Sequence, residues 1–105
     1  MTNNQARKEL LNLIREIDAF ETDAAAFTRK AQMFSNLLYG RPYRDEMAAI
    51  YAQVEVYEQQ LYDAFMDADV AGVRRSTMRR YVERFDGVKA RQAYQNTLNL
   101  YVREG

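Results

Sequence analysis

The sequence has no cysteine and no histidine in its 105 residues. Disulfides, thiolate metal sites and thiol nucleophiles are therefore excluded, and no imidazole is present for acid–base catalysis or metal binding. A glycine-rich phosphate loop and a Gly-x-Ser-x-Gly nucleophile motif are also absent from the sequence. We predict that the chain is not an enzyme, that it uses no cofactor and that it has no metal site.

Long apolar runs are missing as well. No stretch approaches the roughly 20 apolar residues that cross a bilayer, and the first residues lack the basic and apolar pattern of a secretion signal. We therefore expect no contact with a membrane and a cytoplasmic location. The balance of 48% hydrophobic and 29% charged residues is typical of a folded chain, and the length predicts one domain over residues 1–105.

Glycine and proline are scarce, with four glycines and a single proline, and this scarcity predicts long uninterrupted helices. Near the start of the chain, Thr2 and Gln5 have the spacing of a capping box. Apolar residues then recur every three or four positions, which predicts one helix of about 35 residues. An alternative is that Thr22-Asp23 caps a second helix and breaks the first one. The apolar series is Ala6, Leu10, Leu13, Ile17, Phe20, Ala24, Phe27, Ala31, Phe34 and Leu38.

The glycine and proline of residues 39–42 predict the end of this helix, and a second helix is expected over residues 42–70. After an interruption at Gly72, a third helix is expected over residues 76–102. A kink or short break is predicted at Asp86-Gly87, because the apolar pattern slips there.

No segment alternates as a strand would. The predicted fold is all-α, an elongated antiparallel bundle of three long helices, or four if the first breaks near Thr22, with no sheet. Such a bundle has a thin core, and one chain does not easily cover so long a first helix. We therefore predict a homodimer whose self-association seam contains Phe20, Phe27 and Phe34, with small alanines between them.

Charge is segregated along the chain although the net charge is zero. Residues 41–72 carry two basic against seven acidic residues, a net −5, and residues 73–105 carry eight basic against three acidic, a net +5. One interpretation is that the second and third helices lie side by side and pair these charges. The alternative is that the arginines of the third helix contact nucleic acid or a protein partner. These arginines are Arg74, Arg75, Arg79, Arg80 and Arg84.

Glu58 departs from the apolar pattern of the second helix. It follows Val54 by four residues and precedes Leu61 by three, which places it on the apolar face. An unpaired buried charge is costly. We therefore predict a buried ion pair, with an arginine across the bundle as its partner.

Four short segments, spread over a stretch of about 60 residues, resemble the YlbF/YmcA family of small helical bacterial proteins. The resemblance implies an all-α, self-associating cytoplasmic protein that regulates competence, sporulation or biofilm development through partner proteins of the RNA-processing machinery. Some family members are linked to iron–sulfur clusters through cysteines, and no cluster is implied here because this chain has no cysteine. The segments are Ala49-Ile50-Tyr51, Val56-Tyr57-Glu58-Gln59-Gln60-Leu61, Met78-Arg79-Arg80-Tyr81 and Ala93-Tyr94-Gln95-Asn96-Thr97-Leu98-Asn99-Leu100-Tyr101.

The sequence therefore predicts a non-enzymatic regulatory adaptor that acts through protein–protein contacts. A nucleic-acid-associated protein that uses the third-helix arginines is the alternative. Bacteriocin immunity proteins and small phage proteins are helical bundles of similar size, so the fold alone leaves these readings open.

Overall fold

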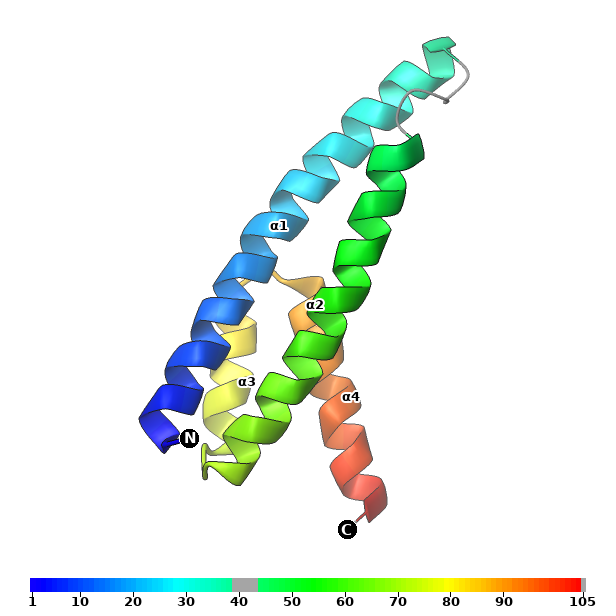
Figure 1. Ribbon diagram of the computed structural model, residues 1–105. Helices are drawn as coiled ribbons and strands as arrows, with labels where there is room; N and C mark the ends of the chain where they lie inside the picture. Colours follow the sequence, from blue (N-terminus) through cyan, green and yellow to red (C-terminus); the bar gives the residue numbers. More distant parts are fainter. Residues whose placement is uncertain (39–43, 105) are drawn as a thin grey trace.

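The computed structural model describes the backbone of residues 1–38 and 44–104, and the side chains of residues 1–33 and 44–103. Within these ranges the chain is all-α and contains no strand, as the sequence predicts (Figure 1). Four helices follow one another along the chain. They are α1 (Asn3–Leu38), α2 (Arg44–Val70), α3 (Arg75–Arg84) and α4 (Val88–Glu104).

Helix α1 is continuous over 36 residues, so the alternative of a break near Thr22 is wrong. The Thr22 hydroxyl donates to the carbonyl oxygen of Asp18 at 3.0 Å, a bond within the helix and not a cap. The capping box at the start is confirmed. The Thr2 amide donates to Gln5 Oε1 at 3.0 Å, and the Gln5 amide donates to Thr2 Oγ1 at 3.2 Å.

The expected third helix is in fact two helices, and the prediction of three long helices is corrected to four. Helix α3 ends at Arg84, and Phe85 is extended with φ −117° and ψ 149°. The predicted break at Asp86-Gly87 is confirmed, because α4 begins only at Val88. Its start is held by α1: the Glu21 carboxylate accepts hydrogen bonds from the amides of Val88 and Lys89, both at 2.8 Å.

The turn between α2 and α3 follows the geometry of a Schellman motif. Gly72 has a φ of +83°, a conformation that glycine adopts without strain. The Val73 amide donates to the Ala68 carbonyl at 2.9 Å, and the Gly72 amide donates to the Asp69 carbonyl at 3.1 Å. This turn reverses the chain direction, and α3 then packs against α1 and α4.

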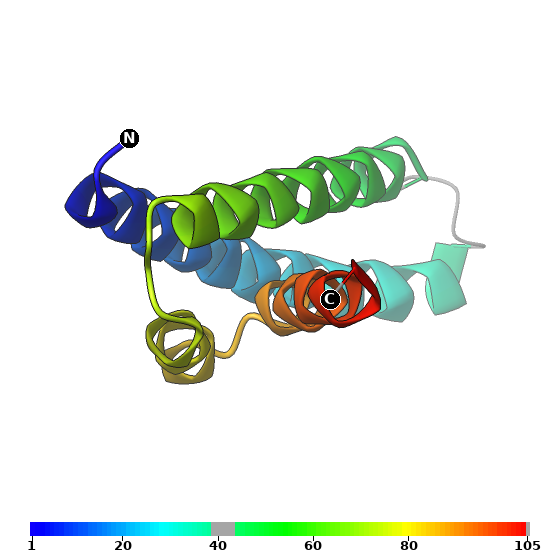
Figure 2. The same ribbon diagram turned by 90° about the horizontal axis from the view of Figure 1, so that it is seen from below.

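The molecule is elongated, measuring 52 × 26 × 20 Å. Helices α1 and α2 form a long hairpin, and the shorter α3 and α4 pack on one face of its lower half (Figures 1 and 2). The core lies in this four-helix part. Its largest fully buried side chains are Phe65, Leu10, Ile14, Ile17 and Leu61.

The upper half of the hairpin consists of two helices only (Figure 1). We call residues 24–38 and 44–55 the two-helix arm. Among its described side chains, only Ala31 is buried. The arm therefore has an apolar stripe that its own two helices cover only in part.

Candidate functional site

The five arginines predicted to form one contact lie on two flanks of α3. Arg75 and Arg79 face α4, where they line a groove with Arg91. On the other flank, Arg84 packs against Phe85 together with Arg15 of α1. The helical spacing between Arg80 and Arg84 places Arg80 on this second flank as well. The structure thus divides the predicted cluster and joins each part to arginines from other helices.

We call the cluster on the α1 flank the arginine ridge, and it consists of Arg7, Arg15, Arg74, Arg80 and Arg84. The guanidinium carbons of Arg15 and Arg84 lie 5.8 Å and 5.7 Å from the centroid of the Phe85 ring, within the range of cation–π contact. The Nε of Arg7 donates to the hydroxyl of Tyr81 at 3.1 Å. At the lower end, Arg7 and Arg74 line one hollow of about 160 Å³ with Asn3, Gly72, Val73 and Thr77.

All five guanidinium groups of the arginine ridge are exposed, and none forms an ion pair with a described carboxylate. Asp18, three residues after Arg15 on α1, is half-buried. The sequence analysis missed Arg7 and Arg15. Their separation of eight residues, about two helical turns, is the signal that places both on one face of α1.

The groove between α3 and α4 has a volume of about 630 Å³ and an apolar floor that includes Val82, Tyr94 and Leu98. Its arginines, unlike those of the ridge, have acidic neighbours. Arg79 pairs with Glu83 at 3.0 Å, Arg75 lies 3.6 Å from Asp69, and Arg91 lies 3.9 Å from Asp86. These pairs neutralise much of the positive charge along the groove.

Tyrosines tie α4 to the elements that pack around it. The Tyr94 hydroxyl donates to the carbonyl oxygen of Arg75 at 2.8 Å, and its ring meets Phe65 edge-on with centroids 5.3 Å apart. The Arg75 guanidinium lies 4.7 Å from the centroid of the Tyr101 ring. Burial raises the pKa of both Tyr94 and Tyr101 above the ordinary phenol value. These phenols act as structural hydrogen-bonding and packing groups.

Glu58 is ion-paired but not buried, which corrects the prediction for this residue. Its Oε1 lies 2.7 Å from the Nζ of Lys89 on α4, and its side chain is 43% exposed. The partner is thus a lysine and not an arginine. Glu58 lies on the edge of α2 that faces the first turn of α4, where Lys89 is located. Both side chains remain partly exposed to solvent there.

The predicted self-association seam is only partly available. Phe20 packs inside the chain, where its ring meets that of Tyr57 edge-on with centroids 5.1 Å apart. Phe27 is half-buried, and the side chain of Phe34 lies outside the described residues. A seam on α1 can therefore start only above Phe20, in the two-helix arm.

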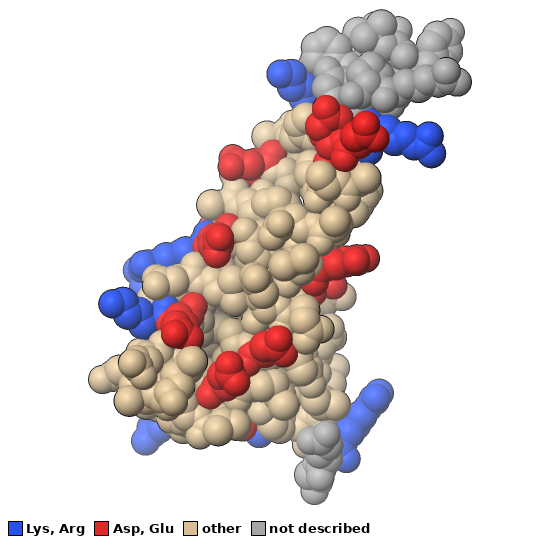
Figure 3. Space-filling model, in the orientation of Figure 1, with Lys and Arg blue, Asp and Glu red and all other residues tan. Residues whose placement is uncertain are grey.

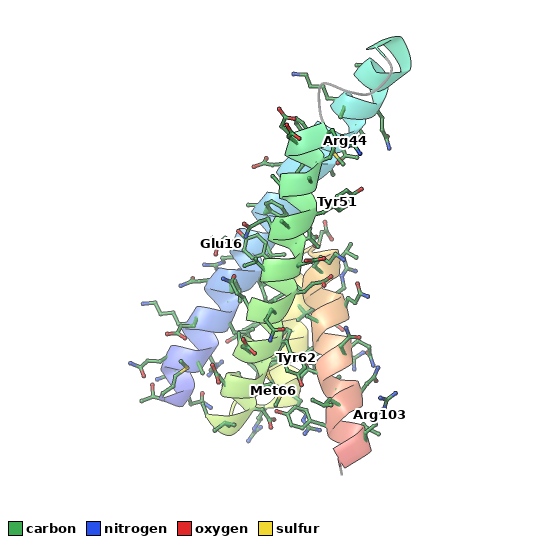
Figure 4. All side chains as sticks on the ribbon, turned by 45° about the vertical axis from the view of Figure 1, so that its right-hand side comes forward. Glu16, Arg44, Tyr51, Tyr62, Met66 and Arg103 are labelled. Carbon is green, nitrogen blue, oxygen red and sulfur yellow. The ribbon has the colours of Figure 1, made fainter. Side chains whose placement is uncertain are left out.

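The arm carries an apolar surface that continues the one covered by α4. Along α2, the residues that contact α4 include Glu58 and Phe65, and Tyr51 lies about two turns before Glu58 on the same face. Figure 4 shows Tyr51 above the start of α4 and pointing away from α1. Its side chain is 64% exposed, and Val88 at the start of α4 is 63% exposed. Met47, Ile50 and Val54 of α2 and Ala24 of α1 are only half-buried within the arm, and Met47 contacts Thr28 of α1 through its sulfur at 3.8 Å.

The described side chains, those of residues 1–33 and 44–103, include no group of three acidic residues placed to hold a metal ion. No helix within residues 1–38 and 44–104 is long and apolar enough to cross a bilayer.

The chain matches no family model, no curated protein and no solved structure.

Proposed function

We propose that this chain is a non-enzymatic interaction protein, a regulatory adaptor, which forms a homodimer through its two-helix arm. The observation that carries the proposal is the apolar surface of the arm. It continues the surface that α4 covers in the lower half, but the described chain supplies no helix to cover it there.

A second copy of the arm supplies the missing helices. Two hairpins packed face to face form a four-helix arrangement, which is how the chain covers the lower half of the same hairpin. A two-fold axis makes the contact self-complementary, because each copy offers the same patch to the other.

Charge along α1 supports an antiparallel pairing of the arms. Asp23 lies directly below the arm, and Arg29 and Lys30 lie within the arm further up the helix; all three are exposed. In an antiparallel dimer the lower end of one arm faces the upper end of the other. Asp23 of each copy then lies toward the basic pair of its partner, which favours this orientation over a parallel one.

Light scattering or sedimentation at micromolar concentration tests the proposal. The parent should have about twice the chain mass of 12.3 kDa. Tyr51→Asp should give a folded monomer, because it places a charge in the apolar seam. The matched control is Val56→Asp, which puts the same charge on another face of α2 at a side chain that is 48% exposed.

Two results would count against the homodimer. If the unsubstituted protein stays at monomer mass at high micromolar concentration, the homodimer proposal is wrong. Dissociation by both aspartate variants to the same degree would show that the effect does not come from the arm surface. Circular dichroism of each variant separates dissociation from unfolding.

A further inference from the structure

The positive charge of the arginine ridge is not paired with any described carboxylate of the protein. Arg7, Arg15, Arg74, Arg80 and Arg84 come together from α1 and the α3 region, all exposed and none ion-paired among the described residues. By contrast, all three arginines of the α3–α4 groove have a carboxylate within 4 Å. We propose that the arginine ridge binds the phosphodiester backbone of a nucleic acid without reading its sequence.

The side-chain contacts on the ridge hold the guanidinium groups without using up their hydrogen-bond donors. Arg15 and Arg84 lie over the Phe85 ring, and a cation–π contact leaves the N–H groups at the edge of a guanidinium free to donate. Arg7 uses only its Nε to bond the Tyr81 hydroxyl. Partly ordered arginines of this kind lose less side-chain entropy when they bind phosphate oxygens.

The length of the ridge suits a run of phosphates. Helix α3 has 10 residues, and at about 1.5 Å per residue it extends over about 15 Å. Phosphates on one strand of a duplex rise by about 3.4 Å each, so about four of them fit along this length. Five arginines are enough to contact such a run.

The surroundings of the ridge favour a polyanion over a protein partner. The centre of a protein interface is built from apolar and aromatic side chains. Among the described residues, the large exposed apolar side chains do not belong to the ridge; they are Met1, Met33, Tyr51, Val56, Val70, Val88 and Val102. Figure 3 shows acidic groups on the face formed by α1 and α2, with basic groups mostly at its edges. This separation of charge orients the ridge toward a polyanion.

Fluorescence anisotropy with labelled 20-nucleotide probes tests the proposal. The probes are duplex DNA, single-stranded DNA and single-stranded RNA, each in two unrelated sequences, titrated from 50 to 200 mM salt. For about four neutralised phosphates on a duplex, the slope of log affinity against log salt should be about −3.6, which is a loss of about 150-fold over this range. The two sequences of each probe should bind equally. The three probe types show which nucleic acid supplies the backbone.

Two triple variants with the same change in net charge distinguish binding at the ridge from non-specific attraction of the nucleic acid to the protein's positive charge. The first combines Arg7→Ala, Arg80→Ala and Arg84→Ala on the ridge, and the second combines Arg75→Ala, Arg79→Ala and Arg91→Ala in the groove. The ridge variant should bind less tightly and lose about 2.7 from the slope on duplex DNA, whereas the groove variant should keep the parent slope. Circular dichroism confirms that both variants are folded.

Several outcomes would overturn the proposal. These are equal loss in both triple variants, binding of polyglutamate of matched length as tight as that of DNA, or binding of vesicles containing phosphatidylserine but not of the nucleic acids. A salt-sensitive dimer that dissociates in the ridge variant would instead assign the ridge to contacts between copies. The binding measurements can be repeated in the arm variant Tyr51→Asp, which leaves the ridge intact, so failure of the arm dimer and failure of the ridge proposal are distinguishable.

Discussion

Glu58 illustrates, at the scale of single residues, how exposure sets the value of an ion pair. The pair with Lys89 is short at 2.7 Å, but the two side chains are 43% and 32% exposed, so water screens the attraction. We expect Glu58→Gln to lower the free energy of unfolding by less than about 1 kcal/mol. Urea denaturation of Glu58→Gln, of Lys89→Met and of the double variant measures the coupling free energy between the two side chains. A loss above about 2 kcal/mol would show instead that the carboxylate is desolvated.

Tyr94 behaves differently because its hydroxyl is used inside the fold. Tyr94→Phe removes the bond to the Arg75 carbonyl and should cost about 1 kcal/mol of stability. Tyr51→Phe, at an exposed side chain, should cost nothing measurable and serves as the control. Equal urea midpoints for the two variants would contradict this role of the Tyr94 hydroxyl.

The same tyrosine predicts how stability depends on pH. Burial raises the pKa of Tyr94 above its ordinary 10.0, so the folded state holds this proton more tightly than the unfolded state. The free energy of unfolding should therefore be constant up to a pH of about 10 and fall as the pH rises through the raised pKa. The loss between pH 9 and pH 11, about the range of phenol titration, should be smaller in Tyr94→Phe than in the parent. An identical loss in both proteins would assign the alkaline effect to other groups.

At the scale of elements, the start of α4 depends on one side chain from another helix. Glu21 accepts two amide hydrogen bonds at 2.8 Å and places a negative charge at the positive end of the helix dipole. Glu21→Ala should lower stability by about 1–2 kcal/mol and increase amide exchange in the first turn of α4. The control is Glu9→Ala, which removes an exposed carboxylate elsewhere on α1. Unchanged exchange at Lys89 in Glu21→Ala would show that the cap contributes little.

The elements themselves could be predicted from local patterns. The capping box at Thr2, the apolar series of α1 and the glycine at position 72 each act within a few residues, so the sequence alone revealed them. The break at Asp86-Gly87 was also visible as a slip in the apolar pattern. The role of Glu21 at the start of α4 could not be predicted, because Glu21 is 67 and 68 positions away from the two residues, Val88 and Lys89, from whose amides it accepts hydrogen bonds.

The candidate sites depend on which helix faces pack against one another, and a single sequence does not reveal this packing. The five arginines near α3 were found as a cluster in the sequence, but the packing of α1 and α4 on opposite flanks divided them. The partners Arg7 and Arg15 became visible only when α1 was placed beside α3. For Glu58, the helical wheel gave the correct side of α2, whereas its exposure depends on where α4 begins.

At the scale of the whole molecule, the core and the arm differ in how firmly their helices are held. Helices α1 and α2 have two further helices against their lower half, and nearly all the core residues lie there. The arm has one buried side chain among its described residues. Because amide exchange follows local opening, the arm should open at a lower free energy than the four-helix part.

Hydrogen exchange measured at two protein concentrations tests both this difference and the homodimer. At low concentration, residues 24–33 and 44–54 should exchange faster than residues 8–20 and 57–68, because fewer packed side chains hold their helices together. At a concentration that favours the dimer, exchange should slow in the arm and stay unchanged along α3, since binding to the folded state stabilises only what the partner covers. Tyr51→Asp should abolish this slowing, whereas Val56→Asp should keep it. Uniform exchange along α1 at low concentration would contradict the division of the hairpin, and slowing along α3 in place of the arm would move the dimer contact to the arginine ridge.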